Sequence, residues 1–137
     1  MIGSAIESIL SGVTKYVEGG KLPDRLRDQW VNYTMISNRP NNTKDGASTY
    51  DGYRFQLDIY SRTYKEMDTL AESVKSTLNE YTGTSESVVI DHIFFDGEWS
   101  TVEYFDVGVT GSFSASGDKA VQAYYRRSQD YIIYVRP

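Results

Sequence analysis

The residues with the types best suited to chemistry lie close together in one apolar segment. His92 is the only histidine of the chain; Asp91 precedes it, and Ser87 lies five residues upstream. Serine, histidine and aspartate are the residue types of a nucleophilic triad. In a strand, however, Asp91 and His92 point to opposite faces, and Ser87 lacks the strained G-x-S-x-G turn that exposes a nucleophile. A small enzyme built on His92 is therefore kept only as an alternative.

Other chemistries find less support. The chain has no cysteine, which excludes disulfides, thiolate nucleophiles and cysteine-bound zinc. One histidine and no cysteine leave only carboxylates as metal ligands, and the adjacent acids of Asp96-Gly97-Glu98 are typical of a solvated turn. No segment matches the G-x-x-x-x-G-K-[ST] phosphate loop. We therefore expect no catalytic residue, no cofactor and no metal, and a protein that is not an enzyme.

The charge balance argues against a nucleic-acid-binding protein. The chain has 14 Lys and Arg against 19 Asp and Glu, a net charge of −5, whereas phosphate binding needs clustered positive charge. Arg126 and Arg127 form the one tight basic pair. This pair is too small for a nucleic-acid surface, and it favours a salt bridge, either within the chain or between subunits.

Length and composition indicate one globular domain. The 137 residues suffice for a core, 39% are hydrophobic, and 12 are tyrosines. Tyrosine suits both exposed strand faces and protein interfaces, so both interpretations stay open. The N-terminus lacks a positive segment and already contains Glu7, and no apolar run reaches the length of a membrane span. We expect a cytosolic protein without a membrane segment.

Apolar periodicity predicts two helices. Residues 2–18 carry apolar side chains at helical spacing before Gly19-Gly20. Thr63 and Glu66 form a T-x-x-E capping box at the start of a second helix. Its apolar stripe, which we assign to the core and which ends before Gly83, comprises Tyr64, Met67, Leu70, Ala71, Val74, Leu78 and Tyr81.

Alternation predicts the strands. Residues 30–37 and 53–60 alternate apolar and polar side chains, and residues 88–95 read as a buried strand. Residues 101–109 follow as a strand or one arm of a hairpin, residues 108–119 are small and polar, and residues 121–135 form one long strand or two broken near Ser128. The order α-β-β-α-β-(β)-β predicts an α+β fold, a mixed, mostly antiparallel sheet packed against two helices.

The connection from Asn38 to Ser48 is long for two hairpin partners. Loops of this length in compact domains tend to be functional or disordered. We read it either as a loose tip or as an arm that orders against a neighbouring subunit. The candidate residues for a contact with another subunit or a tube are Asn38, Arg39, Pro40, Asn42, Thr43, Lys44, Asp45, Arg126 and Arg127.

Several short motifs follow one another in a set order. Ile36-Ser37-Asn38-Arg39-Pro40 precedes Thr43-Lys44-Asp45-Gly46, then come Arg54, Gln56, Asp58, Tyr60 and Ser61, then Thr63-Tyr64-Lys65-Glu66 and Ala71-Glu72-Ser73-Val74. In order and spacing they resemble the tail-completion (tail-terminator) proteins of long-tailed bacteriophages. The resemblance covers residues 30–81, and residues 121–135 look like the closing strand of that family. Residues 98–119 depart from it and look like an insertion in a single tail-terminator-like domain, 1–137.

The resemblance implies a structural protein. Members of this family form a ring, commonly six-fold, on the end of the tail tube, where they stop polymerisation and present a surface for joining the head. The implied partners are further copies of the chain in a probable hexamer, a tail-tube protein, and a head-completion or connector protein. DNA would pass through the lumen without specific binding, and from the net charge we expect an acidic lining. The implied location is the virion, near the head–tail joint, and the host cytoplasm during assembly.

Two further readings remain open beside it. A head-side connector or minor capsid component would share the virion context. A monomeric binding module would use the tyrosine-rich surface on a peptide or small ligand, and would stay monomeric at high concentration.

Overall fold

The computed structural model describes residues 2–14, 17–19, 28–43, 46–106 and 121–136. Within these ranges the chain forms two helices and six strands in one sheet. In chain order they are α1 (Ile2–Leu10), β1 (Val17–Gly19), β2 (Gln29–Thr43), β3 (Gly46–Ser61), α2 (Tyr64–Leu78), β4 (Gly83–Ser85), β5 (Val88–Asp106) and β6 (Val121–Val135).

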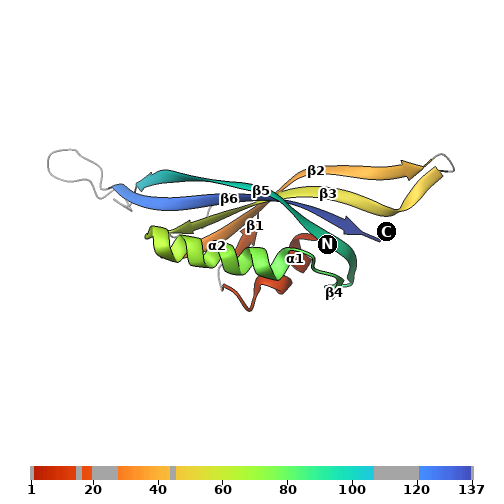
Figure 1. Ribbon diagram of the computed structural model, residues 1–137, viewed down its shortest axis with the longest axis horizontal. Helices are drawn as coiled ribbons and strands as arrows, with labels where there is room; N and C mark the ends of the chain where they lie inside the picture. Colours follow the sequence, from red (N-terminus) through yellow and green to blue (C-terminus); the bar gives the residue numbers. More distant parts are fainter. Residues whose placement is uncertain (1, 15–16, 20–27, 44–45, 107–120, 137) are drawn as a thin grey trace.

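The strands follow the order β1-β2-β3-β6-β5-β4 across the sheet. The β1–β2 pair is parallel and the other pairs are antiparallel. Both helices lie on one face of a long, twisted sheet, which extends beyond them at either end (Figure 1). The predicted α+β fold, a mostly antiparallel sheet packed against two helices, is confirmed.

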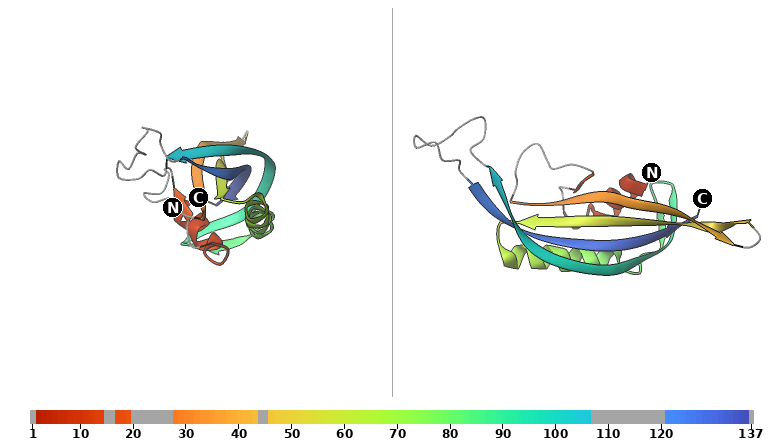
Figure 2. Two further views of the ribbon diagram at one scale, coloured as in Figure 1. Left: turned by 90° about the vertical axis from the view of Figure 1, so that its left-hand side faces the viewer. Right: turned by 90° about the horizontal axis from the view of Figure 1, so that it is seen from above.

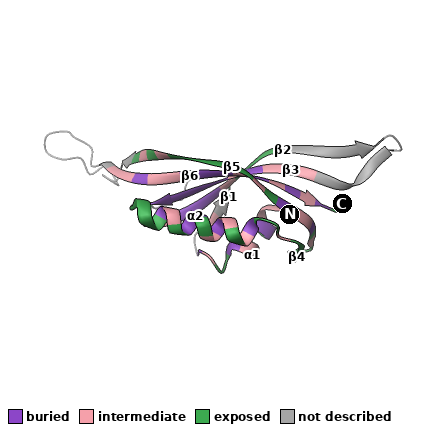
Figure 3. Ribbon diagram, viewed as in Figure 1, coloured by how far each residue is buried: buried purple, intermediate pink, exposed green. Residues whose placement is uncertain are grey.

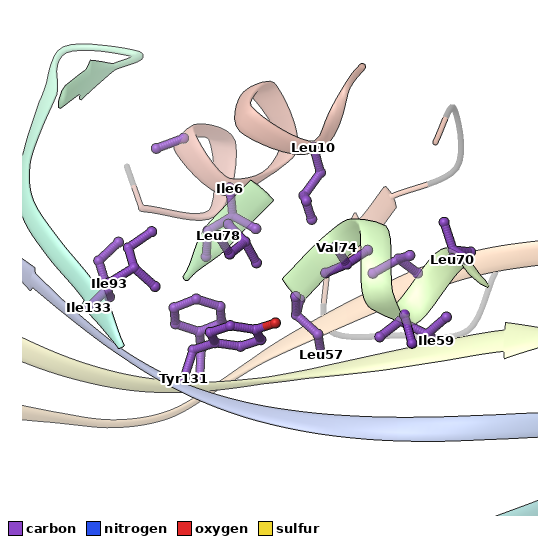
Figure 4. Close-up of a cluster of buried hydrophobic side chains, with 14 of the residues drawn as sticks. Ile6, Leu10, Leu57, Ile59, Leu70, Val74, Leu78, Ile93, Tyr131 and Ile133 are labelled. Atoms are coloured by element: carbon purple, nitrogen blue, oxygen red, sulfur yellow. The ribbon is translucent and has the colours of Figure 1, made fainter. Parts of the chain in front are cut away.

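The core lies between the helices and the middle of the sheet. Buried side chains from α1, α2, β3, β5 and β6 meet there (Figure 4), among them Ile6, Leu10, Leu57, Ile59, Leu78, Ile93, Tyr131 and Ile133. Figure 3 shows that the burial is concentrated in this central part. Because the side chains of a strand alternate between faces, Phe55, Leu57 and Ile59 share the helix-covered face of β3. The alternation predicted for this strand is confirmed.

Helix α2 begins as its sequence predicts. Thr63 is the N-cap, and its hydroxyl accepts a hydrogen bond of 3.2 Å from the backbone N–H of Glu66. The stripe is buried from Met67 to Leu78. The assignment of Tyr64 to the core is wrong, because this first residue of the helix is 52% exposed and packs edge-on against Tyr125. The helix also ends earlier than predicted, at Leu78 with Asn79 as C-cap.

The prediction of one helix over residues 2–18 is wrong. Helix α1 ends at Leu10, whose carbonyl accepts hydrogen bonds from the N–H groups of Val13 and Thr14. Val17 belongs instead to β1 and pairs with Val31. A glycine and β-branched residues have low helix propensity, so sheet pairing prevails over helix extension here. The short strands β1 and β4 were not predicted.

The predicted long loop from Asn38 to Ser48 is wrong. Strand β2 continues to Thr43 and β3 begins at Gly46, so both strands extend beyond the predicted strands. The register contains shifts between Met35 and Ser37 and between Pro40 and Asn42. A bulge is where a strand accommodates an extra residue or a proline, and it lets this strand pass Pro40.

Strand β5 is also longer than predicted. Residues 88–95 and 101–106 of the two predicted strands belong to one continuous strand, which bulges between Phe95 and Gly97, and residues 107–109 lie outside the described ranges. Gly97 has a φ of 153°, a conformation that side chains disfavour. Asp96-Gly97-Glu98 is therefore a bulge and not a turn. Strand β6 is unbroken at Ser128. Of the proposed insertion, residues 98–106 continue β5, and residues 107–119 lie outside the described ranges.

Candidate subunit interfaces

The predicted interface residues from Asn38 to Thr43 lie in the distal half of β2. Asn38 pairs with Tyr53, Arg39 with Gly52 and Pro40 with Asp51. Lys44 and Asp45 lie outside the described residues. The β3–β6 pairing ends where Asp51 faces Val135. Beyond this point, in the described part of the chain, residues 40–43 of β2 and 46–50 of β3 form a two-stranded ribbon, the β2–β3 arm.

A second ribbon leaves the opposite end of the sheet. The β3–β6 pairing ends at Ser61 and Tyr125, whereas β5 and β6 stay paired as far as Asp106 and Val121. Figure 2 shows the β2–β3 arm at one end of the molecule and the β5–β6 ribbon at the other. An isolated two-stranded ribbon is marginally stable in water. Both ribbons are therefore suited to pack against another chain.

The sheet also has two long edges without a strand neighbour among the described residues. β1 covers β2 only from Val31 to Tyr33, and β4 covers β5 only from Val88 to Ile90. The turn after α2 occupies two further groups of β5: the N–H of Glu80 donates to the carbonyl of Ile93 at 2.8 Å, and Asn79 Oδ1 accepts from Phe95 N at 3.1 Å. We call residues 34–43 the β2 free edge and residues 97–106 the β5 free edge.

Large apolar side chains are exposed along both free edges. Met35 and Ile36 are 42% and 51% exposed on β2, and Trp99, Val102 and Tyr104 are 49%, 40% and 71% exposed on β5. Sequence reasoning missed these five residues as interface candidates. An apolar residue in a strand predicts burial, and only the strand order shows that these positions lie where the cover by β1 and β4 has ended.

Arg126 and Arg127 lie in the middle of β6, away from the β2–β3 arm. Arg126 pairs with Tyr60, and Asn38 lies opposite Tyr53, so seven residues of β3, about 23 Å, separate them along the sheet. The structure thus does not join the two groups of predicted interface residues. As neighbours on one strand, the two arginines also point to opposite faces.

Both arginines have carboxylate partners within the chain. Arg126 donates to Asp58 and, at 2.8 Å, to Glu103. Arg127 donates to Asp68 at 2.7 Å and to the Tyr64 hydroxyl at 3.2 Å, and only 7% of the residue is exposed. Burial lowers the pKa of each guanidinium, but the hydrogen bonds to carboxylates outweigh it and raise the pKa of both. Their role at a subunit interface stays a prediction.

The face of the sheet without helices carries a second, smaller cluster around Arg126. Trp30, Tyr60 and Tyr124 are buried together, with the Trp30 and Tyr60 rings stacked at 4.6 Å. The guanidinium of Arg126 lies 4.9 Å from the Trp99 ring, a cation–π contact. Burial, partly opposed by the charge of Arg126, raises the pKa of Tyr60 to about 12. This cluster joins β2, β3 and β6 on the open face, near the start of β2 and the end of β3.

The residues of the enzyme alternative are not assembled into a site. The His92 ring packs against Phe94 at 4.1 Å, while Asp91 pairs with Arg136 at 3.5 Å. Among the described residues no three His, Asp or Glu side chains are arranged to hold a metal ion. A hollow of about 600 Å³ beside α2 is lined by Val13, Asp28, Gln29, Lys65, Glu66, Thr69, Leu70 and Ser73 and does not include His92. No helix in the described ranges is long and apolar enough to cross a membrane.

The fold and its edges define a class: an α+β protein whose sheet extends beyond its helices and, within the described residues, has long strand edges without a neighbour. No protein-family model and no curated protein sequence matches the chain. Among solved structures, a similar fold occurs in a chain of the virion of a native gene transfer agent (GTA) particle. The TM-score is 0.58 at 12% identity, over 94% of this chain and 84% of that one. At this identity the likeness shows a shared fold.

Proposed function

We propose that this protein is a structural subunit of a phage-like virion that forms a closed ring on the end of the tail tube. The ring stops tube polymerisation and offers the surface to which the head is joined. The observation that carries the proposal is the pair of unlike free edges, on β2 and β5, on opposite sides of one sheet.

Two unlike patches on opposite sides suit a ring. Copies that join through different surfaces make a head-to-tail contact, which closes into a ring when the rotation between neighbours is right. Exposed apolar residues on both free edges supply buried area for such a contact. The fold likeness to a GTA virion chain supports the virion context, and the ordered motifs from Ile36 to Val74 support the tail-terminator assignment.

The β2–β3 arm is the proposed contact with a neighbouring subunit or with the tail-tube protein. It is the end of the sheet that extends beyond α1 and α2 (Figure 1). Its strands pair only with each other beyond Asp51 among the described residues. A rigid partner surface would supply the packing that the arm lacks within its own chain.

The lumen is proposed to be acidic, so that DNA passes without adhering. Strand β5 carries Asp91, Asp96, Glu98, Glu103 and Asp106 and no Lys or Arg. Like charge repels phosphate. If β5 carboxylates line the lumen, replacing Asp91, which lies outside the β5 free edge, by lysine should slow DNA passage, and unchanged passage in this variant would count against the acidic lining.

Native mass spectrometry across a wide concentration range tests the ring. A closed oligomer near six copies is expected, without a series of larger open species. Addition of this protein to a polymerising tail-tube protein should then stop tube growth at its ends. A chain that stays monomeric and leaves tube length unchanged would contradict the proposal and favour the monomeric binding module.

A further inference from the structure

We infer that neighbouring copies in the ring join by antiparallel pairing of the β2 free edge of one copy with the β5 free edge of the next, which makes one continuous sheet around the ring. This inference rests on the proposed function. It names the contact surfaces, which the ring proposal alone does not.

The two free edges begin at the same level of the sheet. Thr34 pairs with Gln56, Gln56 with Asp130 and Asp130 with Gly97. From this line across the four central strands, the β2 free edge runs toward the β2–β3 arm and the β5 free edge runs toward the opposite end. Among the described residues, each edge has a strand neighbour on one side of the line and none on the other.

Exposed apolar side chains lie on the open parts of both edges, as they also do at Val89 and Phe94 on the covered part of β5. Soluble proteins usually protect an open edge with charges, prolines or bulges, because unpaired N–H and C=O groups recruit other strands. Here Trp99 and Tyr104 lie past the last backbone groups of β5 that the α2–β4 connection occupies, and Ile36 lies just past the cover by β1. Pro40 and the register shift beside Asn42 protect the distal part of the β2 free edge, and Glu98 and Glu103 lie on the β5 free edge. The exposed apolar residues mark the part of each edge that we infer another strand covers in the assembly.

Charge favours a contact between unlike edges. Arg39 is the one charged residue of β2, whereas the β5 free edge has three acidic residues, Glu98, Glu103 and Asp106, and no Lys or Arg. Two β5 edges would bring like charges together, which disfavours a symmetric β5–β5 dimer. Glu103 already forms a salt bridge with Arg126 of its own chain. The charge difference between the two edges therefore disfavours the wrong contact, β5 against β5, more than it strengthens the contact between β2 and β5.

Strand direction and spacing also fit. Three antiparallel pairings, β2–β3, β3–β6 and β6–β5, connect β2 to β5, so these two strands run antiparallel to each other. Copies placed side by side in the same orientation therefore pair β2 with β5 in the antiparallel sense. Because the two edges run away from one level in opposite directions, neighbouring copies must be staggered along the strands for the edges to overlap. A stagger of about nine residues, about 30 Å, overlaps them without reaching β1 or β4 and brings Ile36 opposite the region of Tyr104.

Disulfide trapping tests the pairing, since the chain has no native cysteine. Ile36→Cys is combined in turn with Trp99→Cys, Thr101→Cys, Val102→Cys and Tyr104→Cys in the full-length protein. Neighbouring strands hold Cα atoms within disulfide range. At least one pair should give a covalent ladder that ends at a closed ring on oxidation. The matched control is Ile36→Cys with Val89→Cys, because Val89 is 39% exposed on the same strand but pairs with β4.

The outcomes separate the pairing from the ring. A ladder from one of the four pairs, at least tenfold above the control, supports the inference. A ring in native mass spectrometry without any ladder above the control would overturn the pairing and leave the proposed ring intact. Dimers cross-linked through Ile36→Cys alone would also overturn it, since they show β2 against β2. A monomer without cross-links would overturn both.

Discussion

The carboxylate of Asp58 on β3 accepts two hydrogen bonds from the guanidinium of Arg126 on β6, at 3.1 Å from Nε and 2.9 Å from Nη2. Ser128 and Gln56 donate to the same oxygen. The Asp58 side chain is 9% exposed and that of Arg126 19%. A largely buried charge therefore joins two neighbouring strands on the face that no helix covers.

Replacing Arg126 by methionine should destabilise the protein by about 3 kcal/mol, because it leaves the charge of Asp58 buried without its partner. Arg54→Met is the matched control: Arg54 pairs with Asp96 at 2.7 Å, but their side chains are 38% and 43% exposed, so a loss of at most about 1 kcal/mol is expected. Urea unfolding measures both. An equal loss of stability in the two variants would contradict the prediction that the buried Arg126–Asp58 pair contributes more than the exposed Arg54–Asp96 pair.

Thr63→Ala should cost about 1 kcal/mol, since it removes the hydroxyl that accepts from the N–H of Glu66 at the start of α2. Thr63→Ser keeps an accepting hydroxyl and should retain most of the stability. The free energy of unfolding from urea titration compares the two. A serine variant as unstable as the alanine variant would show that the methyl group, and not the cap, matters.

Stability should fall at alkaline pH because burial raises the pKa of three tyrosines, Tyr33, Tyr60 and Tyr131. Burial raises the pKa of Tyr60 and of Tyr33 from 10.0 to about 12, and a hydrogen bond of 2.9 Å to Glu7 adds to the rise for Tyr33. Between these values the unfolded chain releases protons that the folded chain retains, so stability is complete below pH 10 and is lost as the pH rises to about 12. In the Tyr60→Phe variant, the free energy of unfolding should decrease less between about pH 9 and about pH 11 than it does in the wild type. Urea titrations at both pH values measure it, and an unchanged loss would contradict the raised pKa.

Removing the β2–β3 arm should separate folding from assembly. Residues 40–51 are replaced by Asn-Gly, which favours a tight hairpin turn between the paired residues Arg39 and Gly52. Because the core residues lie elsewhere, the free energy of unfolding should change by no more than about 1 kcal/mol. Ring formation in native mass spectrometry should be lost. A variant that still forms rings and still caps tubes would exclude the arm from both contacts.

The alternation around Phe55 and Leu57 and the capping box at Thr63 predicted β3 and α2, because each places apolar residues on one face at its own period. The same logic failed where a strand has no buried face. Residues 38–48 are mostly polar and include Pro40, so the distal halves of β2 and β3 have the composition of a loop although they pair as strands. Backbone pairing, which leaves no periodic mark in the sequence, makes them strands.

By itself the sequence determined the fold class, the second helix and the absence of cysteine chemistry, since these depend on local periodicity and composition. Tertiary structure alone decided the strand order, and with it which edges are open. Asp58 meets Arg126 across 68 residues of sequence, and Trp99 of β5 packs against Arg126 of β6 on the face that no helix covers, where it stays 49% exposed. Such relationships depend on how distant strands pair, and neither composition nor periodicity encodes the partner of a strand.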